Sequence, residues 1–166
     1  MEQQKRTSIE LVREFHEIMG HPVEKAPTLP IPSLNELRFK LVIDEATEGY
    51  KASKQMDLVE LADALGDMQY VIDGWFLCAG LQDYKDAIIE EIHASNLSKT
   101  CETVEEVEKS ISVLSSNLPD LNWYEAPFTY KQVGGRYVIV NAMGKVMKPI
   151  GYRKPDIKKV LQLKIF

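Results

Sequence analysis

The amino-acid sequence predicts a mainly α-helical fold: an antiparallel four-helix bundle-like core with a small C-terminal β-hairpin appendage. Through the first hundred residues, apolar side chains recur at helical spacing behind residues that start helices. After Lys99 the pattern becomes an alternation of apolar and polar residues around glycines. The 166 residues, 45% of them hydrophobic, suffice for the core of one domain. We therefore expect a single domain, 1–166, with a helical core at 1–99 and an appended segment at 100–166.

The first helix is indicated by five apolar residues on one face, followed by Gly20 and the proline-rich connector HPVEKAPTLPIP. The five are Leu11, Val12, Phe15, Ile18 and Met19. A connector of this composition is expected to be extended rather than helical.

Two long helices are predicted to follow as an antiparallel hairpin. Ser33 and Glu36 have the spacing of a capping box and would open a helix over about 34–54. Asp57 and Glu60 repeat that spacing before a third helix that closes at Gly80. The link between them is short, so the two helices should pack side by side.

The stretch DYKDAIIEEIHASNLSK is predicted to form the fourth helix and to complete the bundle. Its expected core residues are Ala87, Ile88, Ile92 and Ala94. Thr103 and Glu106 then cap a short helix, and TYKQVGGRYVIVNAMGKVMK predicts a hairpin or meander. A weak, basic helix is expected near the end.

Composition excludes several classes of function. The net charge of −5 gives no reason to expect a nucleic-acid polymer or an anionic membrane as a partner. No apolar run reaches the ~20 residues of a membrane span, and the charged start lacks a signal core. Cys78 and Cys101 fit neither a disulfide framework nor a zinc motif. We expect a soluble, cytoplasmic protein with reduced thiols.

Acidic residues concentrate on both helices of the predicted hairpin. Glu45 and Glu48 are three apart in LVIDEATEGY and project from one helical face. Glu60, Asp63 and Asp67 are spaced by three and four on the next helix. The hairpin can turn these faces toward each other, which would place four or five carboxylates around one small volume.

Such a cluster is costly unless cations neutralise it, and oxygen ligands without His or Cys indicate Mg²⁺ or Mn²⁺. Asp44 lies about 100° from Glu45 and is expected outside the ligand set. Solvated helix faces are also rich in acids, and by pattern alone the two interpretations carry similar weight. Asp63 and Asp67 sit among apolar residues, which favours a functional site.

These motifs resemble the all-α nucleoside triphosphate pyrophosphohydrolase superfamily, which includes MazG-type enzymes, phosphoribosyl-ATP pyrophosphohydrolases and dimeric dUTPases. Its pattern is Glu-x-x-Glu, a gap, then Glu-x-x-Asp; Glu45, Glu48 and Asp67 match three of the four positions. VREFHEIMG, EIHASNLSK and GKVMKPIGYRKPDI are similar to segments of the bacterial and phage branch. Ala64 stands where the family has a glutamate, so the fourth carboxylate would come from Asp63, with Glu60 in reserve.

The resemblance implies Mg²⁺-dependent cleavage of a nucleoside triphosphate to the monophosphate and pyrophosphate, in nucleotide-pool sanitation or balance. It implies catalytic Glu45, Glu48 and Asp67, with Asp63 completing the metal site. It also implies a homodimer or homotetramer. The apolar residues on several sides of the third helix likewise predict a partner surface.

Two basic stretches are candidates for binding the phosphates. The resemblance places Asn96 and Lys99 at the substrate pocket, and Lys148 and Arg153 would close over phosphates from the appended segment. Helix capping and a solvated turn are the alternative roles.

Two other functions stay open. The Ala64 departure motivates a catalytically degenerate nucleotide-binding or structural helical module. The same chemistry with phosphoribosyl-ATP as the substrate is a further alternative, because no residue identifies a base.

Overall fold

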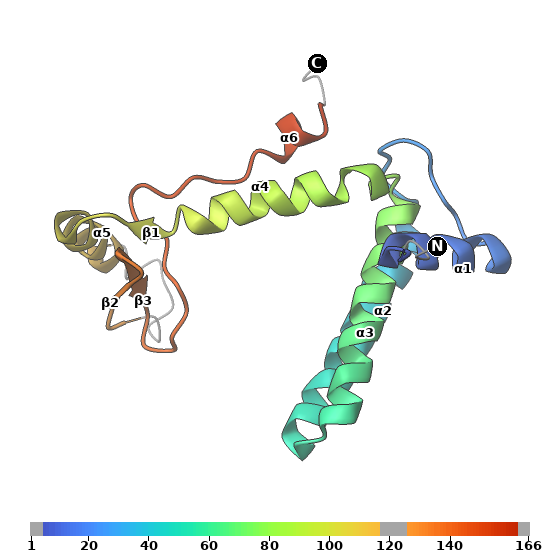
Figure 1. The fold of residues 1–166 in the computed structure, drawn as a ribbon, viewed down its shortest axis with the longest axis horizontal. Helices are drawn as coiled ribbons and strands as arrows, with labels where there is room; N and C mark the ends of the chain where they lie inside the picture. The colour runs from blue at the N-terminus through green and yellow to red at the C-terminus, as the bar shows by residue number, and fades with distance from the viewer. Residues whose placement is uncertain (1–4, 117–125, 163–166) are drawn as a thin grey trace. The chain divides into compact units, whose positions relative to one another are not determined.

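The computed structural model describes residues 5–116 and 126–162. The described residues form six α-helices, one 3-10 helix (η1, Gln82–Tyr84) and a three-stranded antiparallel sheet (Figure 1). This confirms the mainly α fold class. The chain divides into two compact units, Met1–Lys85 and Asp86–Phe166. No helix in the described part is both long and apolar enough to cross a membrane.

The first unit holds α1 (Ser8–Met19), α2 (Pro32–Gln55) and α3 (Leu58–Cys78). A capping box that the sequence analysis did not propose opens α1: Thr7 N donates to Glu10, and Glu10 N donates to the Thr7 hydroxyl. The helix ends at Gly20, whose φ of 69° lies in the left-handed region.

The starts of α2 and α3 differ in how well they were predicted. The Ser33–Glu36 capping box is wrong, because α2 begins at Pro32 behind Ile31 and Ser33 is already helical. Proline at a first helical position needs no partner for its nitrogen. Asp57 caps α3 as predicted, accepting from the backbone N–H groups of Val59 and Glu60.

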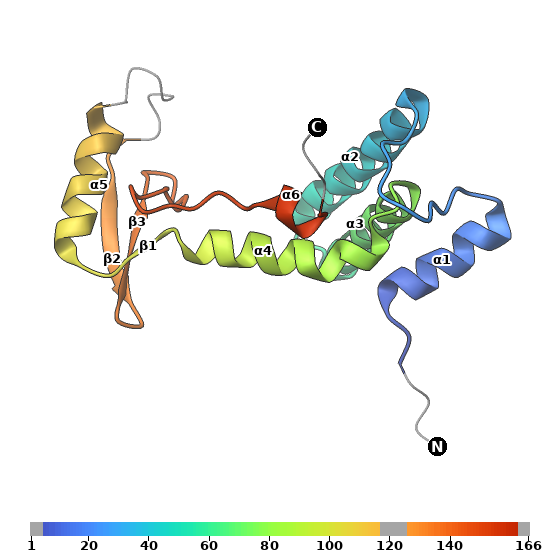
Figure 2. The ribbon, with the colours of Figure 1, turned by 90° about the horizontal axis from the view of Figure 1, so that it is seen from above.

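The α2 and α3 helices run antiparallel and side by side (Figures 1 and 2). Small residues bring them together: Ala52 and Ala64 are buried, and Gly49 is buried opposite Ala64. A Cβ added to Gly49 would lie 3.4 Å from the Cβ of Ala64. This close contact sets the register of the hairpin, and the register determines which acidic residues face one another.

The connector and α1 close one end of the hairpin. His16 on α1 and Arg38 on α2 are both buried over Gly74 of α3, where an added Cβ would lie 2.8 Å from His16 Nε2. Gly80 has a φ of 64°, and its Cβ would meet the carbonyl oxygen of Ala26 at 2.0 Å. A larger residue than glycine at position 80 would therefore displace the connector.

The second unit contains most of α4 (Lys85–Leu97), then β1 (Thr100–Cys101), α5 (Val104–Ser116), β2 (Thr129–Val133), β3 (Arg136–Val140) and α6 (Ile157–Val160). The predicted hairpin is confirmed. Gly134 and Gly135, with φ of 55° and 81°, form its two-residue turn between Val133 and Arg136. The two-residue strand β1 pairs with the other edge of β3 and was not predicted.

The core of the second unit lies between α5 and the sheet (Figure 2) and consists of Cys101, Val107, Ile139 and Met147. Both cysteines of the chain, Cys78 and Cys101, are buried free thiols, as expected. Beyond Met147 the chain returns along α4 (Figures 1 and 2).

All of α4 except Lys85 belongs to the second compact unit, and the predicted division of one domain at residue 99 stays a prediction. Of its four expected core residues, Ile88 is buried, Ala87 and Ala94 are exposed, and Ile92 is 37% exposed. The first unit by itself packs three helices, and a bundle of four that includes α4 stays a prediction.

Candidate active site on the α2–α3 hairpin

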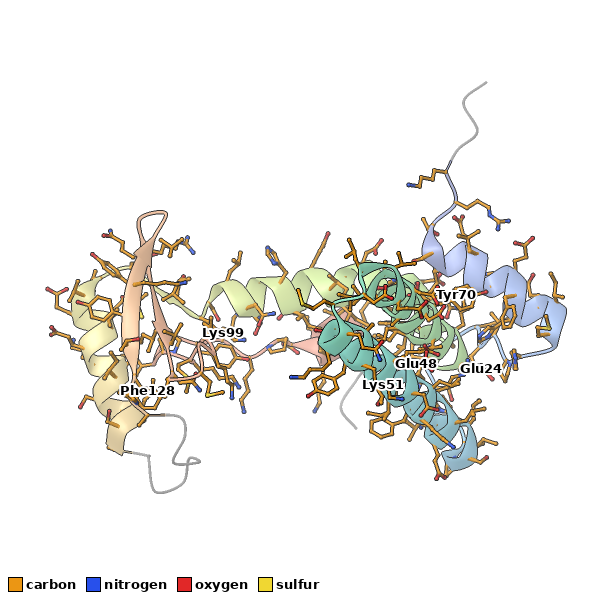
Figure 3. All side chains as sticks on the ribbon, turned by 90° about the horizontal axis from the view of Figure 1, so that it is seen from below. Glu24, Glu48, Lys51, Tyr70, Lys99 and Phe128 are labelled. Atoms are coloured by element: carbon orange, nitrogen blue, oxygen red, sulfur yellow. The ribbon has the colours of Figure 1, made fainter. Side chains whose placement is uncertain are left out.

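The candidate site is built on the α2–α3 hairpin around the contact between Gly49 and Ala64. Glu45 and Glu48 precede Gly49 on α2, within about one helical turn of it. Asp63 and Asp67 flank Ala64 on α3. Because the helices are antiparallel, these four carboxylates lie at neighbouring levels along the hairpin. Figure 3 labels Glu48 on α2.

Glu45 occupies the centre of this acidic group. Its side chain is partly buried, and Oε2 is buried without a hydrogen-bond partner among the described residues. Burial is the largest cause that raises the pKa of the Glu45 carboxyl. Neighbouring charges raise it further, in the order Asp67, Glu48, Asp44 and Asp63. Charges from both helices therefore act on Glu45, and the shared site that the sequence predicts for these acids stays a prediction.

The charges acting on Glu45 bear on the choice between Asp63 and Glu60 as the fourth acid. They include Asp63, one turn before Asp67, whereas Glu60 sits in the first turn of α3, where its backbone N–H is capped by Asp57. Asp63 is thus the one of the two whose charge acts on Glu45, and its place as the fourth acid stays a prediction. Glu60 and Asp63 themselves have the Glu-x-x-Asp spacing of the second half of the family pattern, a match that was not among the predictions from sequence.

Ala64, three residues before Asp67, has a packing role. The residue is 3% exposed and lies against Gly49 at the centre of the helical interface. A glutamate with this orientation would bury its carboxylate between the helices, at a large cost in desolvation. The position therefore contributes close packing here rather than a ligand.

Carboxylate oxygens are suitable ligands for a hard divalent cation, but the side chains of these residues do not converge on one point. In the described residues, no three His, Cys, Asp or Glu side chains converge closely enough to hold a metal ion. Glu48, Asp63 and Asp67 are exposed, so their side chains can rotate toward Glu45 without unpacking the helices. The unpartnered Glu45 oxygen and the mutual repulsion of the acids are what a cation would relieve.

A hollow of about 300 Å³ lies between α1, α2 and α3, and none of the four carboxylates lines it. Leu41 lies one turn from Glu45, and Val71 lies one turn from Asp67 in the same direction along the hairpin. The other lining residues are Val12, Phe15, His16, His21, Leu37, Arg38 and Tyr70. The Phe15 and Tyr70 rings meet edge to face, with centroids 5.7 Å apart. None of these residues was assigned a functional role from the sequence.

The four predicted phosphate-binding residues lie in the second unit and meet different partners. Lys99 Nζ donates to Asn96 Oδ1 at 2.7 Å, and Lys148 Nζ lies 4.8 Å from the centre of the Tyr152 ring. Arg153 forms an ion pair with Glu91. This ion pair occupies the guanidinium that was expected to meet phosphate.

A mainly α fold with an acidic helical hairpin is the architecture expected of the all-α nucleoside triphosphate pyrophosphohydrolase superfamily. Residues 12–96 match the family model of phosphoribosyl-ATP pyrophosphohydrolase, and the chain belongs to this family. The match covers α2, α3 and most of α4 and confirms the resemblance found in the motifs. A search of curated proteins gives no match. The family consists of hydrolases that act on phosphoric anhydrides.

Proposed function

We propose that the protein is a divalent-cation-dependent pyrophosphohydrolase that cleaves a nucleoside triphosphate, or phosphoribosyl-ATP, between the α- and β-phosphates. The observation that carries this proposal is the state of Glu45. The buried Oε2 of Glu45 lacks a hydrogen-bond partner among the described residues, and four further carboxylates of the hairpin act on this group, in a chain of a pyrophosphohydrolase family. An acidic group of this kind needs a cation before it can approach a phosphate chain.

In this proposal Glu45, Glu48, Asp63 and Asp67 hold Mg²⁺, for which Mn²⁺ can substitute. The ion, when bound, neutralises phosphate charge and makes a bound water more acidic. Glu45 is suited to accept the proton of the attacking water at Oε2, because this oxygen is buried without a hydrogen-bond partner among the described residues and burial raises the pKa of the carboxyl. Glu48 and Asp67, more exposed, would serve chiefly as ligands.

The hollow between α1, α2 and α3 is suited to the nucleoside end of the substrate. One helical turn, about 6 Å, separates its nearest lining residues from the carboxylates. Phe15, Tyr70 and Leu37 offer apolar and aromatic surface at its mouth, each more than a third exposed. Arg38 at the hollow is 6% exposed and its Nε has no partner among the described residues. A base with a hydrogen-bond acceptor would satisfy this Nε–H.

The test is an assay of the purified chain against a panel of ribo- and deoxynucleoside triphosphates and phosphoribosyl-ATP. Each substrate is incubated with Mg²⁺, with Mn²⁺ and with EDTA, and the products are separated by chromatography. We expect pyrophosphate, together with the corresponding monophosphate, only when metal is present. Release of a diphosphate and orthophosphate would show that the cleaved bond was assigned wrongly.

A binding module without turnover is the second candidate, and the buried Ala64 is the observation that favours it. In that case nucleotides would bind with metal present, but none of the panel would be hydrolysed. Calorimetry on the same panel separates the two candidates, because only the enzyme releases pyrophosphate.

A further inference from the structure

The sheet of the second unit ends in a strand whose outer edge has no partner in the described part of the chain. The strand order is β1–β3–β2, so β3 is paired on both sides and β2 on one side only. All five residues of β2 are exposed. An edge of this kind presents unpaired backbone N–H and C=O groups to another extended chain.

The register of the β2–β3 hairpin shows which backbone groups of β2 point outward. Val133 and Arg136 flank the two-residue turn, where they form a hydrogen-bonded pair. Such pairs alternate along an antiparallel ladder, so Lys131 also bonds to β3, whereas Tyr130 and Gln132 do not. The N–H and C=O groups of these two residues therefore face the open edge.

Contacts on the far side of β3 support this alternation. Ile139 is the β3 partner of Tyr130, and its carbonyl oxygen accepts from Met147 N at 2.9 Å, on the side away from β2. No described residue forms a hydrogen bond with the backbone of Tyr130 or Gln132. Two donors and two acceptors are thus available to a further strand.

The side chains along β2 and β3 alternate between the two faces of the sheet. Ile139, buried in the core of the unit, marks the face that α5 covers (Figure 2). The other face carries Lys131 and Val133 of β2 and Val138 and Arg136 of β3. Both charged side chains in this group are cations, and no described carboxylate forms an ion pair with either of them.

Lys131 determines which kind of chain can occupy the edge. A second copy of β2 that used all of the outward groups would pair Tyr130 with Gln132 of the copy. This register would set Lys131 directly opposite its own counterpart. Like charges opposite each other are destabilising in a strand pair, whereas opposite charges are stabilising. The chain complementary to β2 therefore carries Asp or Glu opposite Lys131.

We propose that the outer edge of β2 binds an extended acidic segment of a partner protein, which adds to the sheet as a fourth strand. The segment places a carboxylate opposite Lys131 and an apolar side chain opposite Val133, which is 54% exposed. Backbone hydrogen bonds with Tyr130 and Gln132 supply affinity, and the carboxylate supplies selectivity. The inference goes beyond the proposed hydrolysis and does not depend on it.

Two synthetic peptides with the central sequences Val-Thr-Glu-Thr-Val and Val-Thr-Lys-Thr-Val test this edge. Each is titrated into the whole isotope-labelled chain, and nuclear magnetic resonance of the backbone amides gives both the affinity and the place of binding. We expect the acidic peptide to shift the amide signals of Tyr130 and Gln132. It should bind about fivefold tighter than the lysine peptide, because the charge opposite Lys131 changes from attractive to repulsive.

Three variants examine the role of individual groups. Lys131→Glu should reverse the preference, so that the lysine peptide binds tighter. Lys109→Glu makes the same charge change at an exposed position of α5 and should leave the preference unchanged. Gln132→Pro removes an outward N–H while sparing the bonds to β3, and should weaken the binding of both peptides. Circular dichroism checks that each variant is folded.

Three outcomes would overturn the inference. The first is the absence of shifts at Tyr130 and Gln132 with either peptide. The second is equal affinity for the two peptides, or an unchanged preference in Lys131→Glu, because Lys131 would then not select the partner. The third is a larger mass of Lys131→Ala than of the wild type in light scattering, without peptide binding. That result would show that Lys131 only prevents the edge from pairing with a second copy.

Discussion

Glu45 is the residue at which the protein's charge arrangement is least favourable without a cation. Its raised pKa means that the native state holds this proton more tightly than the unfolded chain does. At low pH the carboxyl is protonated in both states, and it does not lower the free energy of unfolding. This free energy falls as the pH rises from the ordinary glutamate pKa through the raised pKa of Glu45. We predict that Glu45→Gln, in EDTA, removes this loss.

Thermal denaturation between about pH 4 and about pH 7 measures the effect. The melting temperature of the variant, relative to that of the wild type, should increase across this range. Added Mg²⁺ should then stabilise the wild type more than the variant. A constant difference at all pH values would show that ionised Glu45 carries no penalty.

The choice between Asp63 and Glu60 is also a matter of single residues. Since the charge of Asp63 acts on Glu45, Asp63→Asn is expected to lower metal-dependent turnover by about 100-fold or more. Glu60→Gln is the matched control on the same helix and should keep most of the activity. Steady-state kinetics on both variants, with circular dichroism for folding, makes the comparison. The reverse ranking would move the fourth acid to Glu60.

At the scale of elements, the α2–α3 hairpin depends on close contact at Gly49. An added Cβ would lie 3.4 Å from Ala64 and 3.8 Å from Met68 Cε, which is ordinary contact. Gly49→Ala should therefore be tolerated and gain up to about 1 kcal/mol from helix propensity. Gly49→Leu should lose about 1–3 kcal/mol by forcing the helices apart. Urea denaturation separates these outcomes; similar losses in both variants would contradict the packing.

The elements show which features local patterns can predict. The α2–α3 hairpin and the Gly134–Gly135 turn follow from helical periodicity and turn chemistry, and both are present. Strand β1 has only two residues, which is too short for an alternation of apolar and polar residues to predict a strand. The contact of Ser95 with Arg153 joins residues that are 58 positions apart in the sequence. The pattern around either residue therefore does not predict this contact.

The candidate site was predictable to a similar extent. The spacing of Glu45 and Glu48 predicts one half of the site, and the hairpin implies that α3 would supply the other half. The role of Ala64 was not visible, because the face that meets Gly49 depends on how the two helices pack. For the same reason the hollow lined by Phe15 and Tyr70 required tertiary structure.

At the scale of the whole molecule, an apolar stripe on α2 indicates self-association. Phe39, Ile43 and Tyr50 share one helical face and are 58%, 48% and 63% exposed. We predict a homo-oligomer, and the double substitution Phe39→Glu and Ile43→Glu should shift it toward the monomer. Light scattering coupled to gel filtration reports the mass. Val133→Glu, at an exposed position of β2, is the control. A monomeric wild type would contradict the prediction.

The central claim is that carboxylates of the α2–α3 hairpin hold a divalent cation. Its most direct test is to measure the affinity of the protein for Mn²⁺ by electron paramagnetic resonance. The titration is run on the wild type, on Glu45→Gln and Asp67→Asn, and on Glu17→Gln of α1 as a control. The hairpin site predicts saturable binding that weakens by about tenfold or more in the first two variants and is unchanged in the control. Equal affinity in all four proteins would show that the α2–α3 carboxylates do not hold the cation.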